Sequence, residues 1–435
     1  MRASRDQLTR HVTGLRRTPA GRVLAASVLA AALALTSACT GGHSSSWQGG
    51  GSSPTEPPAK ASATITGPAA DAKDVPASAE ITFTTKDATK TTFELKDAAG
   101  KTVEGALTKD GGSWLPDGQL DYNTGYTATV TVTDDEGKTA TTSNTFTTMA
   151  RPGNLVQVSS FLGDGAVVGV GMPLIVKFGR AIPQDYRDDV QRRMTVKSTP
   201  AQEGIWHWIS GTEVHYRPKE YWKGGTAITY KLQTGGLPMG SNWYGRSDLT
   251  VDLKIGSSTV MIVDNKNKTM TVRKDGKVVR TIPISLGKAK TPSSSGTMIV
   301  MEKLRKTVFD TFAELGPKEG YRTDIEYAQR LTWGGEFIHA APWSVAQQGR
   351  TNVSHGCVNM SMANAQWLFN QTTIGDPITV KGTERALQNG NGWTVWNLSW
   401  DEYVKGSAIP YEPPPTTKPT PDHSASPSAD ASPAI

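Results

Sequence analysis

Residues 336–360 read EFIHAAPWSVAQQGRTNVSHGCVNM, and they contain Cys357, one of only two cysteines in a chain of 435 residues. Two histidines lie near it in the sequence: His355 two residues before it and His339 eighteen residues before it. A thiol with the ordinary pKa of about 8.5 is only about 3% thiolate at pH 7, so a nucleophilic cysteine needs a nearby base, which is usually histidine. Gly356 permits the unusual backbone angles with which peptide N–H groups can face a developing oxyanion. The stretch therefore predicts a cysteine acyltransferase or hydrolase.

Other uses of this thiol stay open at this point. The simplest is a buried, inert cysteine. A zinc site built from His339, His355 and Cys357 would lack a second cysteine or a denser set of ligands. A redox thiol would lack a partner in a CxxC pair. A structural disulfide is disfavoured because the second cysteine, Cys39, stands at the end of an export signal.

The same stretch resembles the signature of the YkuD family of L,D-transpeptidases: a histidine, fourteen residues, then Ser-His-Gly-Cys, an apolar residue and Asn. The segment TPSSSGTM, residues 291–298, resembles the TP-x-G-T segment that precedes this signature in the family. The segment YRTD, residues 321–324, resembles the loop that covers the site in actinobacterial members. The similarity covers residues 255–405, and it implies a β-rich catalytic domain that needs neither a metal nor an organic cofactor.

The resemblance implies a role for each matching residue. Cys357 would be the nucleophile, His339 the general base, and His355 a third residue of the catalytic set that orients the loop or the substrate. The residues implied for the oxyanion pocket and for substrate binding are Gly356, Tyr321, Asn359, Trp343, Ser354 and Arg350, with packing and surface charge as the alternatives for Trp343 and Arg350. The family often has Ser after the histidine, where this chain has Ala340. We expect the backbone carbonyl at that position, and not a hydroxyl, to orient the imidazole.

The first 38 residues have the layout of a secretory signal, with scattered arginines, an apolar run over residues 23–35 and small residues at the end. The apolar run is too short to span a bilayer, which needs about 20 residues. The segment LTSAC, residues 35–39, resembles a bacterial lipobox, which implies lipidation of Cys39 and a membrane-anchored protein that faces the cell wall. An ordinary cleaved signal is the alternative. Six Arg and one Asp in this segment give +5 of the chain's formal charge of +6, so the remainder offers no electrostatic support for nucleic-acid binding.

Most of the remaining chain consists of short runs in which apolar and polar residues alternate, separated by Gly, Asp and Pro, which predicts a mainly β fold. The run YTATVTVTD, residues 126–134, places apolar and threonine side chains on opposite faces, and LDYNTGY, residues 120–126, resembles the tyrosine corner of immunoglobulin-like domains. The predicted order is a signal peptide (1–38), a lipid-anchored flexible tether (39–60), two immunoglobulin-like sandwiches (61–150 and 151–253), a catalytic domain (254–383), a tryptophan-rich C-terminal cap (384–409) and a disordered tail (410–435). For the aromatic residues of the second sandwich, packing is favoured over a sugar-stacking surface.

Three local patterns add detail to the C-terminal half. Asp275-Gly276 between alternating residues predicts a hairpin. Ser361 is a predicted N-cap for a helix over MANAQWLFNQ, residues 362–371, and Gly375 can end the connection that follows. The stretch NGWTVWNLSWDEYV, residues 391–404, is expected to pack back on the domain before it.

The implied reaction joins two peptidoglycan stem peptides. The thiol would displace the terminal D-alanine of a tetrapeptide donor, and the side-chain amine of an acceptor stem would then attack the thioester to form a 3→3 cross-link. The resemblance also implies acylation by carbapenems. Water as the acceptor would make the same site an L,D-carboxypeptidase, and a protein acceptor would make it a protein-attaching enzyme. An inactive wall-binding lipoprotein is the alternative from another class, and the oligomeric state is open.

Overall fold

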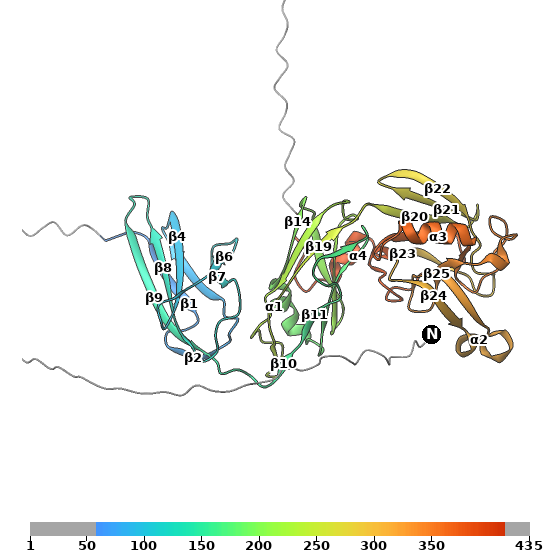
Figure 1. The fold of residues 1–435 in the computed structure, drawn as a ribbon. Coiled ribbons are helices and arrows are strands. Elements are labelled where there is room, and N and C mark those ends of the chain that lie inside the picture. The colour runs from blue at the N-terminus through green and yellow to red at the C-terminus, as the bar shows by residue number, and fades with distance from the viewer. Residues whose placement is uncertain (1–57, 414–435) are drawn as a thin grey trace, which may run out of the picture. The chain divides into compact units, whose positions relative to one another are not determined.

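The computed structural model describes residues 58–413 (Figure 1). The predicted signal peptide, Cys39, nearly all of the tether and most of the tail lie outside the described residues. Strands predominate over helices in the described part, so the prediction of a mainly β fold is confirmed. None of the helices within residues 58–413 is long and apolar enough to cross a membrane.

The N-terminal part forms two sheets, antiparallel except for the parallel pair β2–β9, around an aromatic and aliphatic core. The hydroxyl of Tyr126 accepts a hydrogen bond from the backbone N–H of Asp121 at 2.9 Å, which confirms the predicted tyrosine corner. One sheet has the order β1 (Ser62–Gly67), β3 (Ile81–Lys86), β7 (Ser113–Pro116) and β6 (Gly105–Leu107), and the other has β2 (Ala72–Val75), β9 (Thr139–Thr148), β8 (Gly125–Thr133), β4 (Lys90–Asp97) and β5 (Thr102–Val103).

A second pair of four-stranded sheets follows. One has the order β11 (Val158–Ser160), β13 (Leu174–Phe178), β16 (Glu213–Pro218) and β15 (Gly204–Ser210), and the other has β12 (Ala166–Val168), β19 (Leu249–Ile255), β17 (Ala227–Leu232) and β14 (Met194–Thr199). Short elements accompany them: η1 (Gln184–Tyr186), α1 (Arg187–Arg192), and the paired β10 (Leu155–Val156) and β18 (Tyr244–Gly245). Trp206, Trp208, Tyr216 and Trp222 are buried, which confirms that packing is the role of these aromatic residues.

The C-terminal half contains a six-stranded and a four-stranded sheet. The first has the order β22 (Lys277–Pro283), β21 (Thr269–Lys274), β20 (Thr259–Asp264), β28 (Pro377–Lys381), β23 (Ser294–Ile299) and β29 (Arg385–Ala386), and the second has β24 (Glu302–Asp310), β25 (Arg322–Arg330), β26 (Phe337–Ala340) and β27 (Val358–Met360). Helix α3 (Met362–Gln371) packs on β25 and β26, while α2 (Phe312–Glu319) and η2 (Pro342–Ser344) lie in connections between strands. The apolar faces of both sheets contribute to one core.

The local predictions for this half are confirmed. Asp275 and Gly276 have φ angles of 49° and 79° and connect β21 to β22, as a two-residue hairpin turn requires. The Ser361 hydroxyl accepts a hydrogen bond at 3.3 Å from the backbone N–H of Asn364 at the start of α3. Helix α3 ends at Gln371, and Gly375, with φ of 100°, lies in the connection to β28.

The tryptophan-rich segment after the sheets of the C-terminal half folds into η3 (Val395–Asn397), α4 (Trp400–Tyr403) and η4 (Val404–Gly406). The backbone N–H of Trp393 donates to the sulfur of Met301 in the catalytic domain at 3.4 Å, as expected for a cap on that domain. The indole of Trp396, however, donates to the carbonyl of Gly171 at 2.7 Å, and the Tyr403 hydroxyl donates to the carbonyl of His215 at 2.8 Å. The segment therefore also packs on residues of the second sandwich, whose carbonyl groups accept hydrogen bonds from two of its aromatic side chains.

The N-cap of α3 leads to a first prediction. Ser361→Ala should destabilise the helix by about 1 kcal/mol, because the first-turn N–H groups lose an acceptor. Hydrogen–deuterium exchange of amides in α3 should then speed up about fivefold, while exchange in β8 stays unchanged. Ser361→Asp keeps an acceptor and should exchange like the wild type. Unchanged exchange in the alanine variant would show that tertiary packing alone holds the helix.

Candidate active site

The pairing of two short buried strands brings together residues that are far apart in the predicted motif. Strands β26 and β27 lie side by side in parallel, with His339 opposite Asn359 in the register. Cys357 immediately precedes β27, so the same pairing holds the thiol near the histidine strand. Every residue of the two strands is buried, which leaves little freedom for another register.

Most of the predicted site residues line one cleft of about 280 Å³. Its walls are formed by Tyr321, Thr323, Ile325, His339, Trp343, Val353, Ser354, His355, Cys357 and Asn359. The ring centroids of Tyr321 and His355 are 5.4 Å apart, so the segment predicted to cover the site, residues 321–324, contacts the SHGC loop, residues 354–357. Gly356 and Arg350 are not among the lining residues, and Arg350 is exposed, so its predicted substrate contact stays a prediction.

The imidazole of His339 is held in one tautomer by its own strand. Its Nδ1 lies 2.7 Å from the carbonyl oxygen of Ala340, and because a carbonyl can only accept, Nδ1 carries the proton and Nε2 has a free lone pair. The side chain is buried, and burial lowers the pKa of His339 to about 4. His339 is therefore neutral at pH 7, and the backbone carbonyl orients it, as expected from the presence of alanine at position 340.

Cys357 is half-buried and protonated at rest. Its Sγ lies 3.8 Å from the carbonyl oxygen of Gly335, within reach of a weak S–H hydrogen bond. Burial raises the pKa of Cys357 to about 12, and the negative charge of Glu336 adds to the increase. A hydrogen bond from the backbone of Phe337 favours the thiolate and acts in the opposite direction. A neutral thiol and a neutral imidazole thus line the same cleft, which suits proton transfer during nucleophilic attack.

Hydroxyl groups hold the backbone of the SHGC loop. Gly356 has φ of 124°, a conformation that side chains rarely allow. Its carbonyl accepts a hydrogen bond from Ser293 Oγ at 2.7 Å, and its N–H donates to Ser354 Oγ at 3.2 Å. The Ser354 hydroxyl in turn donates to the carbonyl of Cys357 at 2.6 Å. Ser354 therefore supports the loop from within, while Ser293 supports it from the predicted TP-x-G-T segment.

Asn359 follows Cys357 by two residues, and His355 precedes it by two. Asn359 exchanges backbone hydrogen bonds with Ser285 and donates from Nδ2 to Ser344 Oγ at 3.3 Å. Its Oδ1 is buried without a protein partner, so it can accept a hydrogen bond from a ligand in the cleft. His355 Nε2 lies 2.9 Å from the ammonium nitrogen of Lys288, which donates to it.

Three residues near the thiol carried no site prediction. Ser293 and Glu336 lie inside the quoted segments, but no motif assigned them a role, and Arg385 lies in the predicted cap. Each acts through a partner distant in sequence, which a local pattern does not reveal. Within the described range, no three His, Cys, Asp or Glu side chains converge to hold a metal ion.

Comparison with known proteins agrees with this architecture. Residues 258–380 match the L,D-transpeptidase catalytic domain, YkuD, and residues 72–238 match the bacterial Ig domain. The chain is 34% identical over 334 residues to L,D-transpeptidase 2 of Mycobacterium tuberculosis, an alignment that covers 76% of this chain and 81% of the relative. The chain belongs to the YkuD L,D-transpeptidase family.

Other members of the family show the same similarity. L,D-transpeptidase 5 of Mycobacterium tuberculosis is 33% identical over 362 residues, covering 81% of this chain and 78% of the relative. A solved L,D-transpeptidase in complex with imipenem is 34% identical and covers 53% of this chain and 100% of its own length, with a TM-score of 0.46.

The protonation states at rest lead to a second prediction. Because burial raises the pKa of Cys357, its thiolate fraction should rise about tenfold per pH unit from pH 6 to pH 10 without reaching a plateau. The rate of alkylation by iodoacetamide, followed by peptide mass mapping, should rise with the same slope. Cys357→Ala should show no labelling at this position. A rate that is already flat above pH 6 would instead indicate a resting thiolate–imidazolium pair.

Proposed function

We propose that the chain is a cysteine-dependent L,D-transpeptidase that forms 3→3 cross-links between peptidoglycan stems. The observation that carries the proposal is one cleft lined by both Cys357 and a buried, neutral His339 whose Nδ1 proton is held by a backbone carbonyl. This arrangement leaves Nε2 as the only ring nitrogen able to accept a proton. The family membership supports action on stem peptides.

In the first half-reaction, Cys357 Sγ attacks the carbonyl carbon of the peptide bond between the third residue of the donor stem, a diamino acid, and the terminal D-alanine. His339 Nε2 takes the thiol proton as the S–C bond forms. The N–H group of Cys357 and the hydroxyl of Tyr321 stabilise the oxyanion. The Gly356 N–H, predicted for the same pocket, is instead held by Ser354 Oγ, so Gly356 shapes the loop and does not donate to the oxyanion. The C–N bond then breaks, the proton on His339 passes to the leaving amine, and free D-alanine departs from a thioester.

In the second half-reaction, the side-chain amine of an acceptor stem attacks the thioester carbonyl. His339 removes a proton from the amine and returns it to the sulfur as the C–S bond breaks, which restores the starting site. A thioester is reactive enough for aminolysis as long as water is kept out. The apolar walls contributed by Ile325, Val353 and Trp343 favour a dry cleft. Water as the acceptor gives the carboxypeptidase alternative, and a protein acceptor gives the attaching enzyme.

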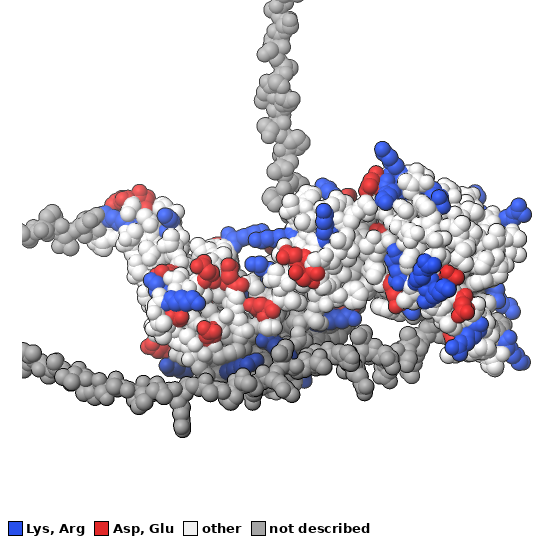
Figure 2. Space-filling view, viewed as in Figure 1, with Lys and Arg blue, Asp and Glu red and all other residues white. Residues whose placement is uncertain are grey.

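The placement of the enzyme is part of the proposal. A secretory signal followed by lipidation at Cys39 would anchor the chain in the cell membrane, with the catalytic domain outside the cell and facing the wall. The immunoglobulin-like sandwiches would then extend the reach of a tether of about 20 residues, whose own r.m.s. length is only about 25 Å. Charged side chains of both signs are interspersed on the visible surface of the described part (Figure 2).

The central test is intact mass spectrometry of the protein incubated with purified disaccharide tetrapeptide. The wild type should form a product with twice the stem mass minus one D-alanine and an acyl adduct on Cys357, and Cys357→Ala should form neither. A tripeptide without a dimer would identify a carboxypeptidase. The absence of both products from a folded protein would instead support the inactive wall-binding alternative.

The orientation of His339 gives a further prediction with imipenem as the probe, since a solved relative was obtained in complex with it. His339→Ala should slow acylation of Cys357 by about 100-fold or more, because it removes the general base. Ala340→Ser should change the rate less than tenfold, because the carbonyl and not the side chain holds Nδ1. A large gain in the serine variant would mean that a hydroxyl at this position is needed.

A further inference from the structure

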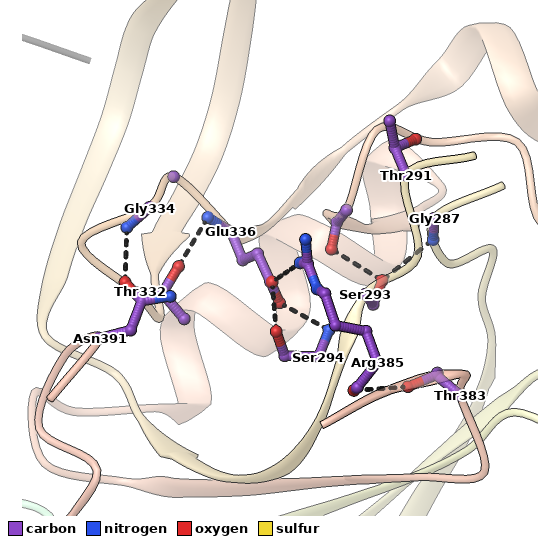
Figure 3. A network of polar contacts seen from close by, with 12 residues as sticks. Gly287, Thr291, Ser293, Ser294, Thr332, Gly334, Glu336, Thr383, Arg385 and Asn391 are labelled. Atoms are coloured by element: carbon purple, nitrogen blue, oxygen red, sulfur yellow. Dashed lines mark hydrogen bonds and ion pairs between the residues drawn. The ribbon is translucent and has the colours of Figure 1, made fainter. Parts of the chain in front are cut away.

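A buried carboxylate lies behind the SHGC loop. The side chain of Glu336 accepts hydrogen bonds from the backbone N–H of Ser294 at 3.1 Å and from its hydroxyl at 2.7 Å, and it forms an ion pair with the guanidinium group of Arg385 (Figure 3). The residue is only 6% exposed, whereas the side chain of Arg385 is 47% exposed. Glu336 is therefore anchored on two sides, by a strand of the six-stranded sheet and by a cation.

This ion pair lies directly against the peptide that precedes the thiol. A Cβ atom placed on Gly356 would be 3.6 Å from Glu336 Cγ and 3.9 Å from Arg385 Nη2, both ordinary packing distances. On the other side, the carbonyl of Gly335, the residue before Glu336, lies 3.8 Å from Cys357 Sγ. A carboxylate and a guanidinium thus pack on the backbone of the nucleophile loop.

The carboxylate also belongs to the framework of that loop. Glu336 holds Ser294, and the neighbouring Ser293 Oγ donates to the Gly356 carbonyl while it accepts from the Gly287 N–H at 2.9 Å. Replacing the carboxylate would loosen this support. Its charge, however, opposes formation of a thiolate nearby, and the charge of Glu336 raises the pKa of Cys357.

The other titratable groups around Cys357 do not offset that charge. Burial lowers the pKa of His339 to about 4, so this residue is neutral at pH 7. Burial raises the pKa of Tyr321, so it stays a neutral phenol. His355, on the nucleophile loop itself, accepts from the ammonium group of Lys288. Arg385 is the cation in contact with Glu336 itself, which places it where it can balance the carboxylate.

We propose that Arg385 is a positioning residue of the reaction, and that its ion pair with Glu336 both holds the nucleophile loop and cancels a negative charge beside Cys357. Arg385 comes from β29, which pairs in parallel with β23 at Ser294, and it lies beyond residues 258–380, which match the family's catalytic domain. The inference rests on the proposed function only in taking Cys357 as the nucleophile.

The two partners should have opposite effects on the pKa of Cys357, so the two single variants should change its alkylation rate in opposite directions. Iodoacetamide alkylation of Cys357 in the full chain would be measured from pH 7 to pH 10 for Arg385→Gln, Glu336→Gln and the double variant. Arg385→Gln leaves the carboxylate of Glu336 without its cation and should slow alkylation, whereas Glu336→Gln should speed it. Each rate should change about threefold per unit of change in the pKa of Cys357, and not about tenfold, because a thiolate of lower pKa is also less nucleophilic. The double variant should return close to the wild-type rate.

A purely structural ion pair would behave differently. Both single variants would then shift the rate in the same direction, and the double variant would recover nothing; either result would overturn the inference. Glu302→Gln is the matched control, because it breaks another ion pair of the catalytic domain, Glu302 with Arg330 at 3.0 Å, and it should leave the alkylation rate unchanged.

Assaying the cross-linked stem-peptide dimer in the same samples separates this inference from the proposed function. Opposite shifts in alkylation rate without any dimer from the wild type would support the role of Arg385 and contradict the transpeptidase reaction. A cross-linked stem-peptide dimer from the wild type, with alkylation unaffected by Arg385→Gln, would support the transpeptidase reaction and contradict the role of Arg385.

Discussion

The site depends on the parallel pairing of β26 with β27. Parallel neighbours cannot be joined by a tight turn and need a crossover of about a dozen residues or more. Here residues 341–357 form that connection, and they end at Cys357. The pairing puts His339 opposite Asn359 and leaves Cys357 at the entry to β27, so the spacing between histidine and cysteine in the sequence follows from the length of the crossover.

Burial of the two strands also sets the chemistry of the pair. Taking an imidazolium or a thiolate out of water disfavours the charged form, so burial lowers the pKa of His339 and raises that of Cys357. At rest the chain then holds a thiol with little thiolate character, and a protonated thiol is less reactive toward oxidants. In the proposed reaction, the thiol becomes reactive when a substrate carbonyl is in place, because transfer of its proton to His339 Nε2 then accompanies formation of the S–C bond.

Local sequence patterns identified those parts of the fold that are determined locally. The hairpin at Asp275-Gly276, the N-cap at Ser361 and the tyrosine corner at Tyr126 each rest on residues a few positions apart, and all three are present. Glu336 and Arg385 are 49 residues apart, and Ser293 and Gly356 are 63 apart, so their contacts depend on which strands become neighbours. The pairing of β29 with β23 decides the contact of Arg385 with Glu336, and a two-residue strand is too short to show a periodic pattern in the sequence.

The same strand bears on where the catalytic domain ends. A boundary after residue 383 separates the tryptophan-rich segment from the sheets, but β29 (Arg385–Ala386) belongs to the six-stranded sheet. The next residue, Leu387, donates its N–H to the carbonyl of Ser295 at 2.7 Å and joins the catalytic core. The first residues of the cap therefore complete the sheet edge from which Ser293 contacts the SHGC loop and Ser294 contacts Glu336. Cap and site are structurally joined at this edge, since the strand that begins the cap also brings the guanidinium group of Arg385 to Glu336.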